Sequence, residues 1–213
     1  MRTAAMHKSV EQSHSAADKP LGFQPFRAEL IDALATVLKG SWGSSCWCMY
    51  PRLSDKQIRA LPGEGSAGAR KRQAMLKLAN RKWAPGLVAF QGEEPIGWIA
   101  VAPRAEYGRI THSRATPPVD NTGVWVIPCI TVRKTARGQG AAVALIRAAV
   151  DYAKRHGAPC VEAYPRAGNE RTQADNVYFG TEALFAKAGF HLVRPPLEGL
   201  PRNWLKRVTM RSN

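Results

Sequence analysis

The chain has 213 residues, of which 45% are hydrophobic and 22% charged, a globular composition that excludes extensive disorder. Lysine and arginine outnumber aspartate and glutamate by 31 to 16, which gives a net charge of +15. Such a charge suits negatively charged partners: phosphorylated cofactors, nucleic acid or acidic surfaces. Residues 1–82 carry a net charge of +8 and residues 83–213 carry +7. This even division of the basic excess argues against a single basic tail.

No apolar run reaches the roughly 18 residues that span a membrane, and the polar N-terminus lacks the apolar core of a secretion signal. The four cysteines have irregular spacing, unlike the framework of a small secreted protein stabilised by disulfides. We therefore expect a cytoplasmic protein in a reducing compartment, with no membrane partner.

The N-terminal part of the chain is predicted to be helical. Residues 1–22 are polar and without periodicity, which indicates a mobile tail, and residues 23–213 are expected to form one domain. Apolar residues recur at helical spacing from Phe26 to Leu38, Gly40 marks the end of this helix, and a longer, very basic helix is predicted over 67–83.

The second half of the chain alternates strands and helices. Such an order, after an antiparallel hairpin, predicts a mixed α/β sheet. The expected elements are a hairpin of strands 86–91 and 95–102, a long connection over 104–121, a strand over 124–132, an apolar-striped helix that ends at Gly157, a strand over 159–164, a helix over 181–188, a strand from 190 to 193 and a last strand over 204–210.

The junction between strand 124–132 and the following helix has the composition of a phosphate-binding turn. Its sequence is Arg137-Gly-Gln-Gly-Ala-Ala142, so small side chains surround the free amides at the start of a helix. Arg133 and Lys134 add positive charge nearby. A plain strand-to-helix turn is the alternative, because Val143 replaces the third glycine of a dinucleotide fingerprint and no Walker A sequence follows.

This junction resembles motif A of the GNAT superfamily of acetyl-CoA-dependent N-acetyltransferases. The family pattern is Arg/Gln-x-x-Gly-x-Gly/Ala, which Arg137, Gly140 and Ala142 match. The segment 183–190 is similar to the family's Tyr-x-Lys-x-Gly-Phe junction between a helix and a strand, and the preceding hairpin resembles the family's central strands. The order and spacing of these motifs together carry the resemblance.

The resemblance covers residues 86–194, about half of the chain, and implies an α/β fold of GNAT type. Its sheet would be mixed and mostly antiparallel, with a parallel, splayed strand pair and flanking helices. Residues 86–194 would be the acetyl-CoA-binding core and 23–85 the acceptor side. Strands 124–132 and 159–164 would splay, and Pro128 fits such a point because proline has no amide for a sheet hydrogen bond.

The resemblance also implies which residues bind acetyl-CoA. A backbone amide near Ile130 would bind the thioester carbonyl and stabilise the oxyanion, and the Val132 amide would hold the pantetheine arm. The pyrophosphate would lie on the amides of the turn. The expected cofactor-binding residues are therefore Ile130, Val132, Arg137, Gly138, Gln139, Gly140, Ala141 and Ala142.

The usual catalytic pair of the family is missing from its usual places. Strand 124–132 has no glutamate, and Phe185 stands where the family has its tyrosine acid. Glu162 and Tyr164 are the substitutes, because residues two apart on a strand share one face, and Tyr178, shortly before the last helix, is a further candidate. A strand carboxylate paired with an arginine is the alternative for Glu162, and a water-mediated base also fits.

The acceptor would bind opposite the cofactor, against an aromatic lining. The candidates are Trp47, Tyr50, Trp98 and Trp125, each with ordinary core packing as the alternative. No metal site is expected, because the pair Cys46 and Cys48 lacks a second pair of ligands.

The sequence thus predicts an N-acetyltransferase that moves the acetyl group of acetyl-CoA to a primary amine, most simply of a small molecule. Acetylation of a macromolecule such as tRNA or a protein, and acetyl-CoA binding without turnover, are the alternatives. Nucleic acid is a less favoured partner, and the protein is expected to be a monomer or a homodimer.

Overall fold

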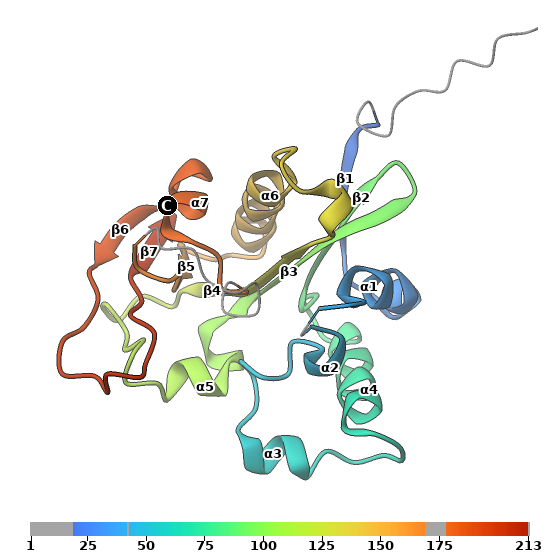
Figure 1. Ribbon diagram of the computed structural model, residues 1–213, viewed down its shortest axis with the longest axis horizontal. Helices are drawn as coiled ribbons and strands as arrows, with labels where there is room; N and C mark the ends of the chain where they lie inside the picture. The colour runs from blue at the N-terminus through green and yellow to red at the C-terminus, as the bar shows by residue number, and fades with distance from the viewer. Residues whose placement is uncertain (1–18, 42, 169–177, 213) are drawn as a thin grey trace, which may run out of the picture.

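A computed structural model describes residues 19–41, 43–168 and 178–212 (Figure 1). Its centre is a seven-stranded sheet in the order β1-β2-β3-β4-β5-β7-β6. All neighbouring strands are antiparallel except β4 and β5, which are parallel. The strands are β1 (Leu21–Pro25), β2 (Gly86–Gln91), β3 (Glu94–Pro103), β4 (Trp125–Val132), β5 (Val161–Ala163), β6 (His191–Arg194) and β7 (Thr209–Ser212).

Helices cover both faces of the sheet. In Figure 1, α6 lies on one side of β3 and β4, and α1, α2 and α4 lie on the other. The helices are α1 (Ile31–Leu38), α2 (Gly43–Cys46), α3 (Asp55–Arg59), α4 (Ala67–Ala79), α5 (Gly108–Thr111), α6 (Ala141–Arg155) and α7 (Glu182–Lys187), with short 3-10 turns at Ala28–Leu30, Arg104–Glu106 and Lys134–Ala136.

The alternation of side chains along the strands divides the core into two layers. On β3, Ile99 packs with the α6 layer, which includes Leu145 and Ile146, and its neighbour Trp98 packs with the layer of α1 and α4. Both layers exclude water from β3, where every residue from Ile96 to Ala102 is buried. The sheet is therefore a rigid base for the segments that follow β4.

The parallel pair β4 and β5 separates early, as the sequence predicted. Its pairs are Trp125 with Val161, Val126 with Glu162 and Ile127 with Ala163, after which β4 continues to Val132 paired only with β3. Proline follows in both segments, at positions 128 and 165. Because proline has no N–H and fixes its own φ, both prolines oppose further pairing. The mixed, mostly antiparallel sheet with one parallel pair confirms the expected fold class.

The sequence prediction was wrong at the start of the domain. It placed a tail over 1–22 and helical spacing from Phe26, whereas Leu21–Pro25 form strand β1, paired with β2, and α1 begins at Ile31. Residues 1–18 of the expected tail lie outside the described residues. A five-residue strand held by long-range pairing has too few residues to show a period of two.

Two further elements have boundaries that differ from the sequence prediction. The basic helix expected over 67–83 ends at Ala79, and the last strand is Thr209–Ser212 rather than 204–210. No helix among the described residues is both long enough and apolar enough to cross a membrane.

Candidate active site

A cleft of about 520 Å³ opens where β4 extends beyond its pairing with β5. One side is β4 and the turn that follows it, and the other is the segment between α1 and the end of α2. Four of the predicted cofactor residues lie in it: Ile130, Val132, Arg137 and Ala142. The complete lining in the described part of the chain is Gly40, Ser41, Gly43, Cys46, Cys48, Cys129, Ile130, Thr131, Val132, Lys134, Arg137, Ala142 and Tyr178.

The turn between β4 and α6 has the geometry of an anion site. Gly138 and Gly140 both have positive φ, 78° and 79°, which side chains other than glycine rarely adopt. Nothing lies within 4 Å of the Cβ position at either glycine, so the backbone is open to a ligand. Gly140 is the N-cap of the 15-residue helix α6, whose first amides have no partner within the helix and carry the positive end of its dipole. The turn therefore fits a pyrophosphate, and its remaining predicted residues, Gln139 and Ala141, lie in the same backbone segment.

Two of the three basic residues near this turn face the cleft. Lys134 and Arg137 line it, and Arg137 Nε donates to the Val132 carbonyl at 3.0 Å. Arg133 instead forms an ion pair with Glu94 at 2.5 Å, on the hairpin between β2 and β3. The expected contribution of Arg133 to the phosphate site is not seen in this arrangement.

Beyond the pairing with β5, the β4 amides that face away from β3 are those of Ile130 and Val132. The Arg133 amide donates to Ile96 of β3, and hydrogen bonds alternate along an antiparallel pair, so residues 130 and 132 point toward the gap beside β5. The Ile130 amide donates to the carbonyl of Tyr178 at 2.8 Å. The proposed oxyanion donor is thus engaged by the chain itself, and Tyr178, which the sequence offered as a further substitute for the missing tyrosine acid, lines the cleft.

Three cysteines, Cys46, Cys48 and Cys129, gather at the inner end of the cleft. The Trp98 indole Nε1 donates to Cys48 Sγ at 3.0 Å. A hydrogen bond from Cys129 and the Trp98 bond, against the effect of burial, lower the pKa of Cys48 below its ordinary value. Burial raises the pKa of Cys46 to about 12, and the pKa of Cys129 is also raised.

The backbone at this cluster is in a rare conformation. Trp47 and Cys48 have φ of 48° and 52°, although neither is glycine. Left-handed backbone at an ordinary residue costs about 1–2 kcal/mol, and such strain concentrates at functional sites. Cys48 therefore reaches β4 through a strained turn, and sequence spacing alone gave no sign of this.

Glu162 and Tyr164, the predicted base and acid, lie in a buried ion cluster and not among the residues that line the cleft. Glu162 is 1% exposed and accepts hydrogen bonds from Arg211 Nη2 at 2.5 Å and from the Tyr164 hydroxyl at 2.7 Å. Arg104 donates to the same hydroxyl, and Arg211 also pairs with Asp120 at 2.8 Å. This is the pairing with arginine that the sequence offered as the alternative.

Burial and, second, the charge of Glu162 raise the pKa of Tyr164 well above its usual range. A hydroxyl with a raised pKa gives up its proton reluctantly, so Tyr164 suits a positioning role better than that of an acid. The catalytic assignment of both residues stays a prediction.

The predicted acceptor aromatics are scattered. Trp98 is fully buried, with its ring 5.7 Å from that of Phe26, and Trp125 packs against Trp83 with ring centroids 5.6 Å apart. Trp47 is 7% exposed and belongs to the core under α1. Tyr50, 36% exposed, lines a second cavity of about 490 Å³ on the other side of Tyr178.

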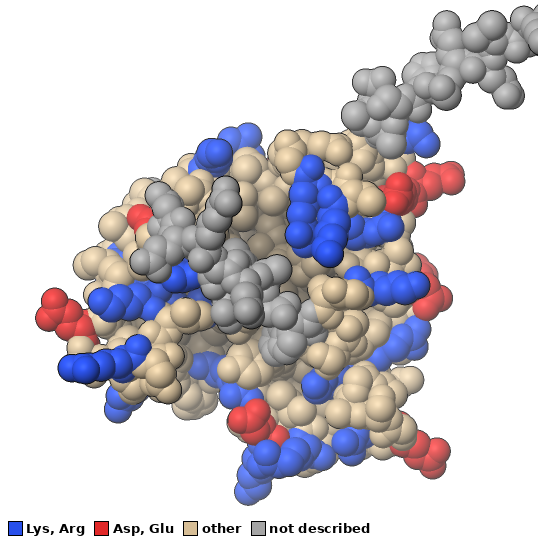
Figure 2. Space-filling model, in the orientation of Figure 1, with Lys and Arg blue, Asp and Glu red and all other residues tan. Residues whose placement is uncertain are grey.

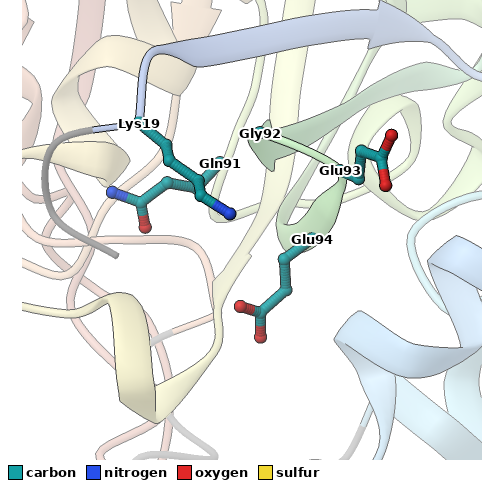
Figure 3. Close-up of a pocket in the computed structure, with 5 residues that line it drawn as sticks. All are labelled: Lys19, Gln91, Gly92, Glu93 and Glu94. Atoms are coloured by element: carbon teal, nitrogen blue, oxygen red, sulfur yellow. The ribbon is translucent and has the colours of Figure 1, made fainter. Parts of the chain in front are cut away.

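A third cavity, of about 500 Å³, lies at the turn between β2 and β3 and lacks convergent groups. Figure 3 shows the carboxylates of Glu93 and Glu94 pointing away from one another, with the Lys19 side chain beside Gln91. Within the described ranges, no group of three or more histidine, cysteine, aspartate or glutamate side chains is arranged to hold a metal ion.

On the face shown in Figure 2, positive charge is spread rather than concentrated at one place. Figure 2 shows lysine and arginine side chains around most of the visible face, with a few acidic ones between them. This agrees with the even division of basic residues along the sequence. It gives the surface a general attraction for anions.

Comparisons with known proteins agree with the geometry of the cleft. Residues 52–180, more than half of the chain, match the Acetyltransferase (GNAT) family. A search of curated proteins found no match.

Solved structures with a similar fold include a PaiA N-acetyltransferase from Thermoplasma acidophilum in complex with coenzyme A (TM-score 0.52, 14% identity, 91% of this chain and 99% of that one). An N-acetyltransferase from Staphylococcus aureus Mu50 is similar at a TM-score of 0.53 (14% identity, 91% and 98%). A GCN5-related N-acetyltransferase from Kribbella flavida has a TM-score of 0.51 (14% identity, 85% of this chain), and this chain spans 35% of its length. At such identities the likeness shows the fold, and the match of residues 52–180 shows the family. The chain therefore belongs to the acetyltransferase (GNAT) family and is an acyltransferase.

Proposed function

We propose that the protein transfers the acetyl group of acetyl-CoA to the primary amine of a small-molecule acceptor, by direct attack of the amine on the thioester. The observation that carries this proposal is the cleft beside β4, which runs from the anion-binding turn to the gap left by β5. Such a cleft suits an extended ligand with phosphates at one end and a reactive group at the other.

The residues of the cleft fit acetyl-CoA. The open backbone at Gly138 and Gly140 and the free amides of α6 would bind the pyrophosphate, with charge from Lys134 and Arg137. The Val132 amide would hold the pantetheine arm. The Ile130 amide would stabilise the oxyanion once it leaves the Tyr178 carbonyl.

Acetyl-CoA supplies an activated acetyl thioester. The neutral amine attacks the thioester carbon and forms the new C–N bond, and the C–S bond breaks. The nitrogen then loses one proton and the leaving thiolate takes up one, so that the reaction is balanced. Glu162 and Tyr164 remain our candidates for proton transfer. Since both are buried in the arginine cluster, transfer to either would need a water between them and the amine.

A small-molecule acceptor is favoured over a macromolecule by the spread of positive charge in Figure 2. A surface dedicated to RNA would be expected to concentrate its lysines and arginines. Gel shifts with tRNA at about 150 mM salt test this, because weak non-specific binding fades under those conditions. A tight, saturable complex would favour the macromolecular acceptor.

The cofactor claim is tested by calorimetric titration of acetyl-CoA into wild type and Gly140→Asp. The new carboxylate would lie at the expected pyrophosphate, so we expect at least a tenfold loss of affinity. Gly157→Asp is the matched control, because Gly157 also has a positive φ, 85°, and open space, but lies at the opposite end of α6. It should bind acetyl-CoA like the wild type.

Release of free thiol from acetyl-CoA in the presence of a panel of amines then tests turnover. Acetylated amine in the mass spectrum supports the proposed reaction. Absence of acetyl-CoA binding in wild type, or equal affinity in wild type and Gly140→Asp, would contradict the site.

A further inference from the structure

The second cavity, of about 490 Å³, is a built pocket that the cofactor does not need. It lies between α5, the segment after α2 and the loop that joins β6 to β7, which run side by side in Figure 1. Tyr50 and Trp204, two of the three large hydrophobic residues that are exposed in the described structure, line it. Exposed aromatic side chains around a cavity are typical of a ligand site.

Aromatic rings and guanidinium groups are paired along its walls. Arg207 lies over the Phe179 ring, 3.8 Å from its centroid, and Arg109 lies over Tyr50 at 4.2 Å. The charge of Arg109 is compensated by Asp55, at 2.5 Å. The described lining of the cavity contains no acidic side chain.

Arg207 differs from Arg109 because its charge has no such compensation. Its Nη1 donates to the Tyr164 carbonyl at 3.0 Å, and among the described residues no carboxylate lies within ion-pair distance of it. Burial removes part of the hydration of this guanidinium and thereby lowers the pKa of Arg207. A partly desolvated cation gains most from an anionic ligand, and arginine binds carboxylates and phosphates with two parallel hydrogen bonds.

This pocket adjoins the cofactor cleft. Tyr178 lines both cavities, and its carbonyl accepts the hydrogen bond of the Ile130 amide at the end of the parallel pairing. Tyr50 lines the pocket two residues after Cys48, which lines the cleft. Tyr178 is thus a wall shared by the pocket and the cleft, and a ligand in the pocket would lie beside the cofactor cleft, as an acceptor must.

From this geometry we propose that the acceptor is an amine that also carries an anionic group, a carboxylate or a phosphate, and that Arg207 binds this group while Tyr50 and Trp204 flank the rest of the molecule. The inference rests on the proposed acetyl transfer and specifies its substrate class. It assigns Arg207 to substrate binding.

Binding is tested without turnover, by calorimetric titration of the protein alone and of the protein saturated with coenzyme A. The probes are 3-phenylpropanoate, phenyl phosphate and the neutral 3-phenylpropanamide, at about 150 mM salt. We expect at least one anion to bind ten times more tightly than the amide, and the two anions distinguish a carboxylate from a phosphate. An amide that binds as tightly as both anions would overturn the proposal.

Substitutions of arginine test whether Arg207 causes this preference for anions. Arg207→Met should abolish the preference for the anion, and Arg207→Lys should keep part of it. The matched control is Arg114→Met, because Arg114 faces Trp204 at 5.8 Å but does not line the cavity. Equal loss in Arg114→Met would mean that general surface charge is responsible. Since Arg207 also supports the Tyr164 carbonyl, the wild-type probe series and Arg207→Lys decide the question if the methionine variant does not fold.

Turnover separates this inference from the proposed function. In wild type and Arg207→Met, kcat/KM is compared for L-phenylalanine against L-phenylalaninamide and for 2-aminoethyl phosphate against ethanolamine. The preference for at least one acid over its neutral counterpart should fall at least tenfold in Arg207→Met, and the ratio between variants cancels the intrinsic reactivity of each amine. Equal preferences in the two proteins would overturn the inference while acetyl transfer stands. Absence of acetyl-CoA binding would overturn the proposed function, and the titrations on the protein alone would still report on the pocket.

Discussion

Replacement of Glu162 by glutamine is the perturbation that best separates structure from catalysis in this protein. The wild-type carboxylate is 1% exposed and joins Arg211 on β7 to the Tyr164 hydroxyl, with Arg104 3.9 Å away. Glutamine keeps the size of the side chain and one acceptor oxygen but removes the charge. Two arginines would then share the buried site without their anion.

The expected cost follows from this geometry. Removal of one partner from a buried ion pair costs about 3–5 kcal/mol, because the other charge stays buried. The retained amide oxygen and the second carboxylate on Arg211, that of Asp120, place Glu162→Gln at the lower end, about 3 kcal/mol. For a chain of this length each kcal/mol shifts Tm by roughly 2–4 °C, so we expect a decrease of about 6–12 °C.

Thermal unfolding followed by circular dichroism measures the effect. Asp120→Asn is the control, because Asp120 bonds the same arginine but is exposed to solvent, and its loss should leave Tm almost unchanged. A Tm for Glu162→Gln within about 2 °C of the wild type would refute the account of the ion cluster. The pH–rate profile of the folded variant, measured well below Tm, tests the other role: loss of the decrease in rate at low pH, the acidic limb, would identify Glu162 as the general base.

Further predictions concern the cleft and the core. Arg137→Met should weaken acetyl-CoA binding about tenfold because it removes a charge that lines the cleft, whereas Arg133→Met should not, and calorimetry compares the two. Cys48, with its lowered pKa, should react with iodoacetamide at a lower pH than Cys46, and acetyl-CoA should protect it; peptide mass spectrometry that finds Cys46 labelled first would contradict this. Tyr152→Phe removes the acceptor of a buried backbone N–H at 2.8 Å, so the free energy of unfolding in urea should fall by about 1–3 kcal/mol.

The features that sequence predicted well are those that a short segment determines. Helix α6 follows from the apolar stripe that includes Leu145 and Ala149, and the turn before it follows from two glycines that adopt positive φ. Pro128 indicates the end of the parallel pairing because a proline lacks the amide that a paired strand needs.

The features that sequence missed depend on contacts between distant segments. Strand β1 exists because it pairs with β2, about 65 residues later in the chain. The hydrogen bond from the Ile130 amide to the Tyr178 carbonyl and the stacking of Arg207 on Phe179 join segments whose sequences show no common pattern. Trp98 and Trp125 illustrate the same difficulty, since aromatic side chains suit a core and a ligand pocket equally until their neighbours are known.

The early end of the pairing between β4 and β5 affects how far the amino-acid sequences of such proteins can diverge. Beyond Ile127, β4 presents main-chain groups as the exposed edge of a strand does, but inside a continuous sheet. A ligand recognised by main-chain groups constrains the path of the chain far more than the identity of its side chains. Substitutions can therefore accumulate around this edge while its hydrogen-bonding pattern persists, which explains how structures only 14% identical to this chain keep the same arrangement of strands.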